Sequence, residues 1–406
     1  MLRRRAALAA LSASVLAACG GPGVAGGAGT ASSAQPTGSA TPTSAPPTSA
    51  PPTADTAAPT HAPSSPGAAS CTEEAAALSL EKQVGQLFMV GVTPGQGTQR
   101  VVAAGVGSII LLGTWTGGRA ATAAQVEAFT RAVPGLLVAT DQEGGVVQRL
   151  KGTGFDTIPN APAQAALGDE ALGQAADRWA TQLWAAGVRY NLAPVADVVP
   201  TAKLTTNQPI GVLKRGYGSD AATVGARVAA FVTGMERASV ATSLKHFPGL
   251  GEVTGNTDFT SATDSVTTRT SASIASFRAG IAAGASSVMV SSAVYSKIDP
   301  GVPAVFSKLI VTEMLRGDLG FTGVAISDDL GAAESVSGVS PGDRAVRFFA
   351  AGGDLLINAD VTLQAAMTDA VLKRAKADPA FARQVTTSAA RVLALKASLG
   401  IGSCRR

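Results

Sequence analysis

Short apolar runs alternate with longer Ala-rich segments from about residue 76 to residue 400. Apolar runs that are rich in β-branched residues and bounded by turn residues are typical of buried strands. Eight such runs occur, at 86–92, 107–112, 136–140, 190–195, 242–244, 287–290, 324–326 and 354–357. Segments with helical spacing lie between most of them, at 162–185, 220–238, 270–283, 307–317, 341–351, 362–376 and 379–399.

This alternation predicts an α/β fold with parallel strands joined by right-handed crossovers. Eight such units close into a (β/α)8 barrel of the TIM type, which is the architecture we expect. The alternative is a doubly wound open sheet. No Gly-x-Gly-x-x-Gly follows the first strand to suggest a dinucleotide.

The first 70 residues have a different composition from the rest. Met1-Leu2-Arg3-Arg4-Arg5 and the apolar run that follows it have the form of a secretory signal, and its end, Leu16-Ala17-Ala18-Cys19, resembles a bacterial lipobox. We therefore predict a signal peptide over residues 1–19, with Cys19 lipidated; an ordinary signal peptide is the alternative. The chain would then be exported and lipid-anchored to the outer face of the cell membrane.

Residues 20–70 consist mainly of Gly, Ala, Pro, Ser and Thr, which predicts a disordered linker. The globular domain is expected over residues 71–406. Cys71 and Cys404 lie near its two ends, and in an exported protein they favour a disulfide between the termini, with two free thiols as the alternative. Too few His and Cys remain for a zinc site, and we expect neither a metal nor a cofactor.

The formal net charge is +4, but basic residues do not form a stripe interleaved with aromatic ones. Nucleic-acid binding therefore has little support. We expect a monomer.

Polar side chains follow several of the predicted strands. In a barrel these strand ends surround a single mouth, where active sites are built. Several charged groups without a His cluster favour recognition of a polar neutral molecule over metal catalysis. The groups are Asp141 and Arg149 after the third strand, Asp197 after the fourth, Arg215 in the next loop, Lys245 and His246 after the fifth, Ser291 and Ser292 after the sixth, and Asp328 and Asp329 after the seventh.

Each group also has a structural alternative. Asp141 and Asp329 could cap helices, Arg149 could pair with Glu143, and Asp197 could cap its own loop. Lys245 and His246 could form a hydrogen-bonded structural pair at a strand end. Asp328 is the hardest to explain structurally, because a carboxylate after a buried strand and beside a second carboxylate is costly.

An ordered set of motifs resembles the family 3 glycoside hydrolases, in particular their single-domain β-N-acetylglucosaminidase branch. The resemblance covers roughly residues 76–400. Its pieces are Asp141-Gln142-Glu143-Gly144-Gly145 with Arg149, Asn191-Leu192-Ala193-Pro194-Val195-Ala196-Asp197, Arg215-Gly216-Tyr217-Gly218, Lys245-His246-Phe247-Pro248-Gly249, Gly320-Phe321-Thr322-Gly323 and Ser327-Asp328-Asp329-Leu330.

The resemblance implies retaining hydrolysis, in which one carboxylate attacks the anomeric carbon and a second group transfers protons. By position, Asp328 resembles the nucleophile. The family's sugar-binding positions correspond to Asp141, Arg149, Arg215, Lys245 and His246.

The proton-transfer group departs from the family pattern. The branch usually reads Lys-His-Phe-Pro-Gly-His-Gly followed by Asp-Ser-His, whose His transfers the proton. Here Leu250 replaces the first variable His, and Asn256-Thr257-Asp258 stands where Asp-Ser-His would be. A carboxylic acid can do general acid/base work, so we hypothesise that Asp258 does it, with Glu252 and Asp264 as the next candidates. An anionic Asp258 would repel phosphate, which favours a hydrolase over a phosphorylase.

The sequence thus predicts an exo-acting enzyme that removes terminal β-linked N-acetylglucosamine from cell-wall fragments. Two alternatives stay open: a β-glucosidase or β-xylosidase of the same family, and a catalytically inactive carbohydrate-binding lipoprotein, which the missing His would allow.

Overall fold

The computed structural model describes residues 71–404. The predicted signal peptide, Cys19 and the linker over residues 20–70 lie outside these residues.

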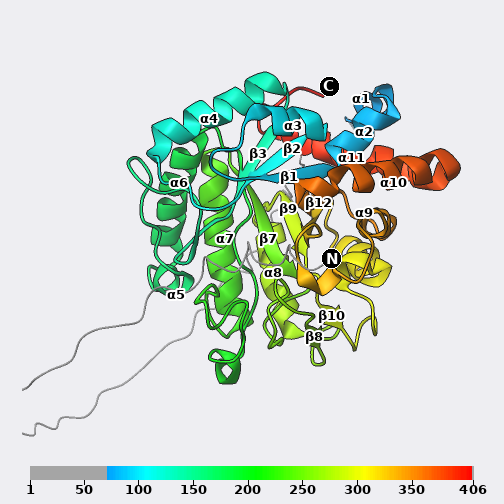
Figure 1. The fold of residues 1–406 in the computed structure, drawn as a ribbon. Helices are drawn as coiled ribbons and strands as arrows, with labels where there is room; N and C mark the ends of the chain where they lie inside the picture. Colours follow the sequence, from blue (N-terminus) through cyan, green and yellow to red (C-terminus); the bar gives the residue numbers. More distant parts are fainter. Residues whose placement is uncertain (1–70, 405–406) are drawn as a thin grey trace, which may run out of the picture. The chain divides into compact units, whose positions relative to one another are not determined.

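Eight parallel strands form a closed barrel, and each pairs with both of its neighbours (Figure 1). The TIM-type barrel is therefore confirmed and the open-sheet alternative is wrong. All eight runs that were predicted as strands overlap a barrel strand. In order around the barrel the strands are β1 (Phe88–Val92), β2 (Ser108–Leu111), β3 (Leu137–Thr140), β6 (Tyr190–Asn191), β7 (Ala241–Phe247), β9 (Ser287–Val290), β11 (Val324–Asp329) and β12 (Leu355–Asn358).

Two small sheets lie outside the barrel. β4 (Gln142–Gly144) and β5 (Val147–Gln148) form an antiparallel hairpin after β3. β8 (Thr263–Asp264) pairs in parallel with β10 (Val294–Tyr295). Both sheets belong to the excursions that follow barrel strands at their carboxyl ends.

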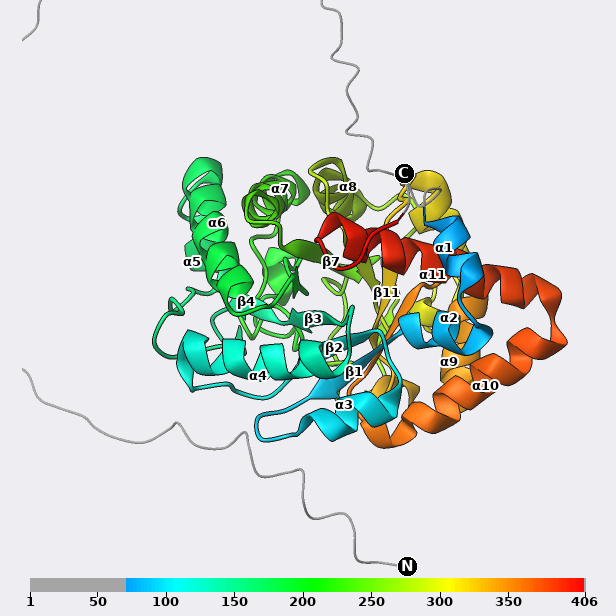
Figure 2. The same ribbon diagram turned by 90° about the horizontal axis from the view of Figure 1, so that it is seen from above.

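Helices surround the strands, as the view in Figure 2 shows. The α-helices are α1 (Thr72–Ala77), α2 (Leu80–Gln86), α3 (Thr98–Ala104), α4 (Gly118–Ala132), α5 (Ala161–Ala165), α6 (Asp169–Ala185), α7 (Ala221–Arg237), α8 (Ala275–Ala282), α9 (Pro341–Ala350), α10 (Gln364–Ala377) and α11 (Pro379–Ser398). A π-helix spans Leu309–Asp318, and 3-10 turns span Thr201–Lys203, Ala272–Ile274, Ala304–Phe306, Glu334–Val336 and Val361–Leu363. None of the helices within residues 71–404 combines the length and apolar character needed to cross a membrane.

Local signals explain where the helices begin. Asp220 accepts a hydrogen bond from the Thr223 N–H at 2.8 Å and so caps α7. Asp378 caps α11 in the same way, and Pro379 occupies the first helical position, where its missing N–H costs nothing.

The segment 162–185, expected as one helix, is divided into α5 and α6. Gly168 interrupts it with a φ of +80°, a conformation that glycine adopts without steric cost. Asp169 and Glu170 then start α6 with two carboxylates in its first turn, where the helix dipole favours negative charge. The sequence pattern alone did not indicate this break.

α11 closes the amino-terminal end of the barrel. Val392 and Leu395 pack into the same apolar cluster as Met89 of β1 and Ile110 of β2. Lys396 Nζ donates to Gln86 Oε1 at 2.6 Å, directly before β1. The carboxyl ends of the strands are therefore the end of the barrel at which a ligand can enter.

The two ends of the described domain are joined covalently. Cys71 and Cys404 form a disulfide with a Cα–Cα distance of 5.0 Å and a sequence separation of 333 residues. Cys71 is buried and precedes α1. Because a disulfide that closes a long loop restricts the unfolded chain strongly, this bond should stabilise the whole barrel.

We predict that replacing both cysteines, Cys71→Ser with Cys404→Ser, lowers the free energy of unfolding by about 2–5 kcal/mol. Urea unfolding of the domain followed by circular dichroism measures the change. Dithiothreitol should lower the midpoint of the wild-type domain and leave that of the double variant unchanged. Equal midpoints for oxidised and reduced wild-type protein would contradict the prediction.

Candidate active site

Three cations and two carboxylates gather at the carboxyl ends of β3 and β7. Asp141 follows β3, Glu143 lies in β4 of the hairpin, and Arg149 follows β5. Lys245 lies in β7, and Arg215 comes from the long segment between β6 and α7. Residues separated by about a hundred positions therefore meet because barrel strands end at one rim.

Lys245 is the centre of this cluster. Its Nζ lies 2.8 Å from Asp141 Oδ1 and 2.6 Å from Glu143 Oε1, and its side chain is 3% exposed. Arg215 makes a two-pronged contact with Glu143, from Nε to Oε2 at 2.9 Å and from Nη2 to Oε1 at 2.8 Å. Arg149 is looser, with Nη2 3.8 Å from Asp141 Oδ2.

The alternative that Arg149 pairs with Glu143 is therefore wrong. Arg149 lies nearest Asp141, and Glu143 pairs with Arg215 and Lys245. Asp141 does not cap a helix either, since the hairpin β4–β5 follows it. Glu143 was not predicted as a site residue. The only signal for it was an acidic residue two positions after Asp141, which does not reveal where its side chain lies.

The charges in this cluster stabilise one another. Burial alone would raise the pKa of Glu143, but Arg215 and Lys245 hold it well below its usual value. Burial alone would lower the pKa of Lys245, and Asp141 and Glu143 reverse that effect and raise it. Glu143 and Lys245 therefore stay charged near neutral pH and can make charge-assisted hydrogen bonds to hydroxyl groups.

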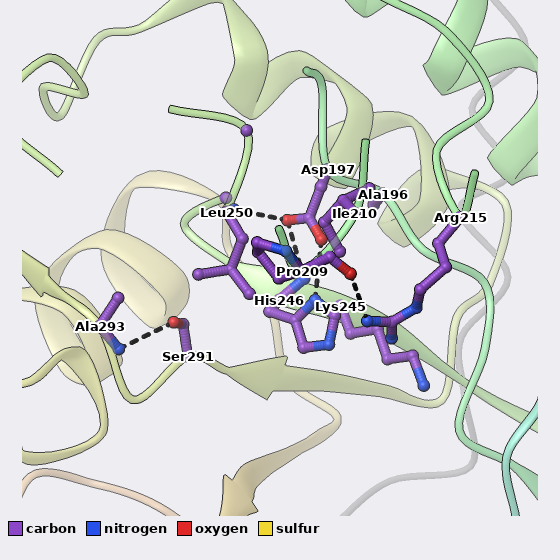
Figure 3. A network of polar contacts seen from close by, with 12 residues as sticks. Ala196, Asp197, Pro209, Ile210, Arg215, Lys245, His246, Leu250, Ser291 and Ala293 are labelled. Atoms are coloured by element: carbon purple, nitrogen blue, oxygen red, sulfur yellow. Dashed lines mark hydrogen bonds and ion pairs between the residues drawn. The ribbon is translucent and has the colours of Figure 1, made fainter. Parts of the chain in front are cut away.

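Asp197 orients His246 (Figure 3). Its Oδ2 lies 2.8 Å from His246 Nδ1, and its Oδ1 accepts the backbone N–H groups of His246 at 3.1 Å and Leu250 at 2.7 Å. An ionised carboxylate can only accept hydrogen bonds, so Nδ1 carries a proton. Within residues 71–404, His246 Nε2 has no hydrogen-bond partner, which leaves it available to a ligand. Asp197 thus stabilises the loop after β7. The sequence had suggested instead that Asp197 caps the loop in which it lies itself.

Leu250 occupies the position where a His was expected from the resemblance. Its side chain is buried in the apolar core, and only its backbone N–H contributes to the site, through Asp197. The apolar side chain therefore supplies no proton-transfer group.

Asp328 and Asp329 end β11, but they have different surroundings. Asp329 accepts the N–H groups of Gly331, Ala332 and Ala359 at 2.8–3.0 Å, so it fixes the loop. It caps this turn and no helix. Among residues 71–404, Asp328 accepts only the Asp329 N–H, at 2.9 Å.

Burial raises the pKa of Asp328 to about 6; the charge of His246 opposes the rise, whereas the charge of Asp258 adds to it. His246 and Asp258 are therefore close enough to Asp328 to interact with it electrostatically. Because the Asp328 carboxylate accepts few hydrogen bonds, its oxygens are available to react with a ligand.

Asp258 lies on the loop between β7 and β8 and is exposed. Its N–H bonds to Asn256 Oδ1 at 3.0 Å, and its carbonyl accepts the Glu334 N–H at 3.2 Å. The two other candidates for proton transfer are engaged elsewhere. Glu252 pairs with Lys203 at 2.6 Å, and Asp264 is buried and accepts the backbone N–H groups of Val266 and Thr267 at 2.7 Å.

Ser291 and Ser292, the polar pair after β9, support the loops around this space. Ser291 Oγ accepts the Ala293 N–H at 3.0 Å, and Ser292 Oγ bonds to Ser335 Oγ at 2.8 Å. In the part of the chain that the structure describes, no group of three or more His, Cys, Asp and Glu side chains is arranged to hold a metal ion.

A model of the glycosyl hydrolase family 3 N-terminal domain matches residues 79–395, most of the chain. The chain belongs to glycosyl hydrolase family 3. A β-hexosaminidase of Stenotrophomonas maltophilia is 36% identical over 230 residues, which are 54% of this chain and 66% of that protein, just under two thirds of its length.

Solved structures of the family have the same fold. A β-N-acetylhexosaminidase from Beutenbergia cavernae is 50% identical, with a TM-score of 0.77, over 79% of this chain and 98% of that one. A family 3 β-N-acetylglucosaminidase from a Paenibacillus species is 29% identical, with a TM-score of 0.71, over 81% of this chain and 65% of that one.

The Asp197–His246 contact can be tested by the substitution Asp197→Asn. An amide that still accepts the two backbone N–H groups would turn its NH2 toward Nδ1 and favour the other tautomer of His246. If His246 binds the ligand, losing one such hydrogen bond corresponds to about 1–3 kcal/mol, a roughly fivefold to 150-fold lower kcat/KM.

Asp354→Asn is the matched control, because Asp354 is equally buried and accepts a backbone N–H, from Ala325, at the opposite end of the barrel. It should lower stability without changing kcat/KM of the folded protein. Equal kcat/KM for Asp197→Asn and the wild type would contradict a role for this contact in the site.

Proposed function

We propose that this family 3 chain is an exo-acting, retaining β-N-acetylhexosaminidase that removes terminal β-linked N-acetylglucosamine. Relatives and solved structures with the names β-hexosaminidase, β-N-acetylhexosaminidase and β-N-acetylglucosaminidase support the activity. The observation that carries the proposal is the environment of Asp328, a partly buried carboxylate that shares the barrel mouth with the Lys245 cluster.

In the proposed first step, a carboxylate oxygen of Asp328 attacks the anomeric carbon while the bond from that carbon to the leaving oxygen breaks. In the reactive form of this pair, Asp328 is ionised and Asp258 holds the proton, which it gives to the leaving oxygen, so the departing sugar is a neutral alcohol. In the second step, Asp258 takes a proton from water as the water oxygen attacks the anomeric carbon and releases Asp328. One water is consumed, and both carboxyl groups return to their starting states.

The cluster around Lys245 supports the binding of the terminal sugar. Asp141, Arg149, Arg215 and Lys245 offer charged donors and acceptors, and His246 adds a ring nitrogen. The contacts within the cluster hold its side chains against one another, and this orients the groups that would meet a sugar. Charge-assisted hydrogen bonds to several hydroxyls would position the anomeric carbon at Asp328.

We further propose that the substrates are cell-wall fragments and that the protein acts outside the membrane. The disulfide between Cys71 and Cys404 supports an oxidising compartment. The signal-like residues 1–19 with Cys19 support export and lipid anchoring.

The activity is tested with 4-nitrophenyl N-acetyl-β-glucosaminide and, for comparison, the matching glucoside. The protein assayed is residues 71–406, cleaved from the purified full-length chain. We expect turnover of the N-acetyl substrate and its loss in Asp328→Ala. Asp258→Ala should lower hydrolysis by about 10²–10⁴-fold. Azide should restore turnover in that variant, because it attacks the glycosyl-enzyme without a base.

Glu252→Ala is the matched control, since Glu252 lies in the same loop but is paired with Lys203. It should keep its activity. Azide rescue of Glu252→Ala in place of Asp258→Ala would overturn the assignment of the acid/base. Absence of turnover of both glycosides by folded protein would favour a carbohydrate-binding lipoprotein instead.

The raised pKa of Asp328 predicts a pH dependence. A nucleophile must be ionised, so kcat/KM for a 2,4-dinitrophenyl glycoside, whose leaving group needs no proton from Asp258, should fall as the pH drops through about 6. Because the charge of Asp258 contributes to raising this pKa, Asp258→Asn should move the acidic limb to lower pH. A 2,4-dinitrophenyl glycoside makes the limb measurable in this variant, since its leaving group needs little protonation.

Asp369→Asn, a change of an exposed carboxylate on α10, controls for the change in net charge and should leave the limb in place. A wild-type limb near the ordinary pKa of an aspartate, or an unmoved limb in Asp258→Asn, would contradict this account.

A further inference from the structure

The loop that carries Asp258 forms an exposed crest, which we define as residues 258–261. The residues on either side of it are buried: Thr257 is 3% exposed and Ala262 is 5% exposed. The crest leads directly into β8, whose position is visible in Figure 1. It is therefore a short raised segment between two buried residues.

Hydrogen bonds hold the crest at both ends. The carbonyl groups of Thr257 and Asp258 accept the N–H groups of Ser335 and Glu334, each at 3.2 Å. Beyond the crest, the Ala262 carbonyl accepts the Val294 N–H at 2.9 Å. The crest is thus attached to the loops that follow β9 and β11.

Phe259 is the most exposed of the large hydrophobic side chains in residues 71–404, at 77%. The next exposed aromatic side chain, Trp184, is 49% exposed, and the Arg189 guanidinium lies 4.4 Å above its ring. Within residues 71–404, Phe259 has no comparable contact with a ring or a cation. Its apolar surface is left to water, and covering it with another apolar surface would be favourable.

The position of the crest shows what could cover it. The bonds to Glu334 and Ser335 attach it to the loop that follows Asp328 and Asp329, the last residues of β11. The charge of Asp258, directly before Phe259, acts on both of these carboxylates. Phe259 therefore lies at the rim of the mouth, next to the group that would protonate the leaving oxygen.

We propose that Phe259 is a stacking platform for the leaving-group sugar, a specificity determinant that rests on the proposed hexosaminidase function. One face of a β-linked pyranose ring presents mainly C–H groups, which can cover the aromatic ring, while the hydroxyls at its edge stay in water. Phe259 thus selects substrates whose leaving group is a second sugar ring.

The test compares two substrates that share the terminal sugar and differ in the leaving group. N,N′-diacetylchitobiose leaves a sugar that can reach the crest, whereas N-acetyl-β-glucosaminyl fluoride leaves only fluoride. We expect Phe259→Ala to lower the ratio of kcat/KM for the disaccharide to kcat/KM for the fluoride by about two- to tenfold. Phe259→Trp should keep the ratio at or above the wild-type value.

Trp184→Ala is the matched control, an exposed aromatic near the end of α6, and it should not change the ratio. An unchanged ratio in Phe259→Ala overturns the platform while leaving the hexosaminidase proposal intact. Absence of fluoride hydrolysis by the wild-type protein overturns the hexosaminidase proposal itself. The two failures are therefore distinguishable.

Discussion

The contact on which the mouth of this barrel depends is the burial of Lys245 between Asp141 and Glu143. It joins β7 to the excursion after β3, and Arg215 extends it to the segment before α7. Burying ions costs several kcal/mol of desolvation free energy per ion, so such a cluster is not favoured for stability alone. Removing one member would leave its partners buried and unpaired, which costs about 3–5 kcal/mol. The cluster therefore has a fixed geometry, as a site for hydroxyl groups requires.

The sequence was sufficient for the barrel because buried parallel strands are apolar on both faces and stand out from their surroundings. It was also sufficient for the positions of Asp141, Lys245 and Asp328 at the mouth, since barrel topology brings strand ends together wherever the strands lie along the chain. The partners of these residues could not be derived in this way. Glu143 faces Arg215 because of the turn of the β4–β5 hairpin, and Arg149 faces Asp141 for the same reason.

The loops were harder to predict than the strands because their side chains are positioned by contacts from several segments. Asp197 looked like a local cap, yet it accepts hydrogen bonds from the loop after β7. Leu250 is a second example of a loop residue whose surroundings the sequence did not predict. Its backbone N–H donates to Asp197, while its side chain packs in the core. Membership of the family agrees with the barrel that the structure shows. The proposed proton-transfer group, Asp258, lies on a loop, at the position where the resemblance implies a histidine.

The charges divide the mouth into two regions. Lys245, Arg215 and Arg149 make one region cationic, whereas Asp258, Asp328 and Asp329 make the other anionic. His246 connects them, because it follows Lys245 in the chain and its charge lowers the pKa of Asp328. Burial and the neighbouring carboxylates favour a protonated Asp328, and His246 works against them. Asp197 orients that imidazole, so a buried carboxylate that need not touch the sugar helps to keep the proposed nucleophile ionised.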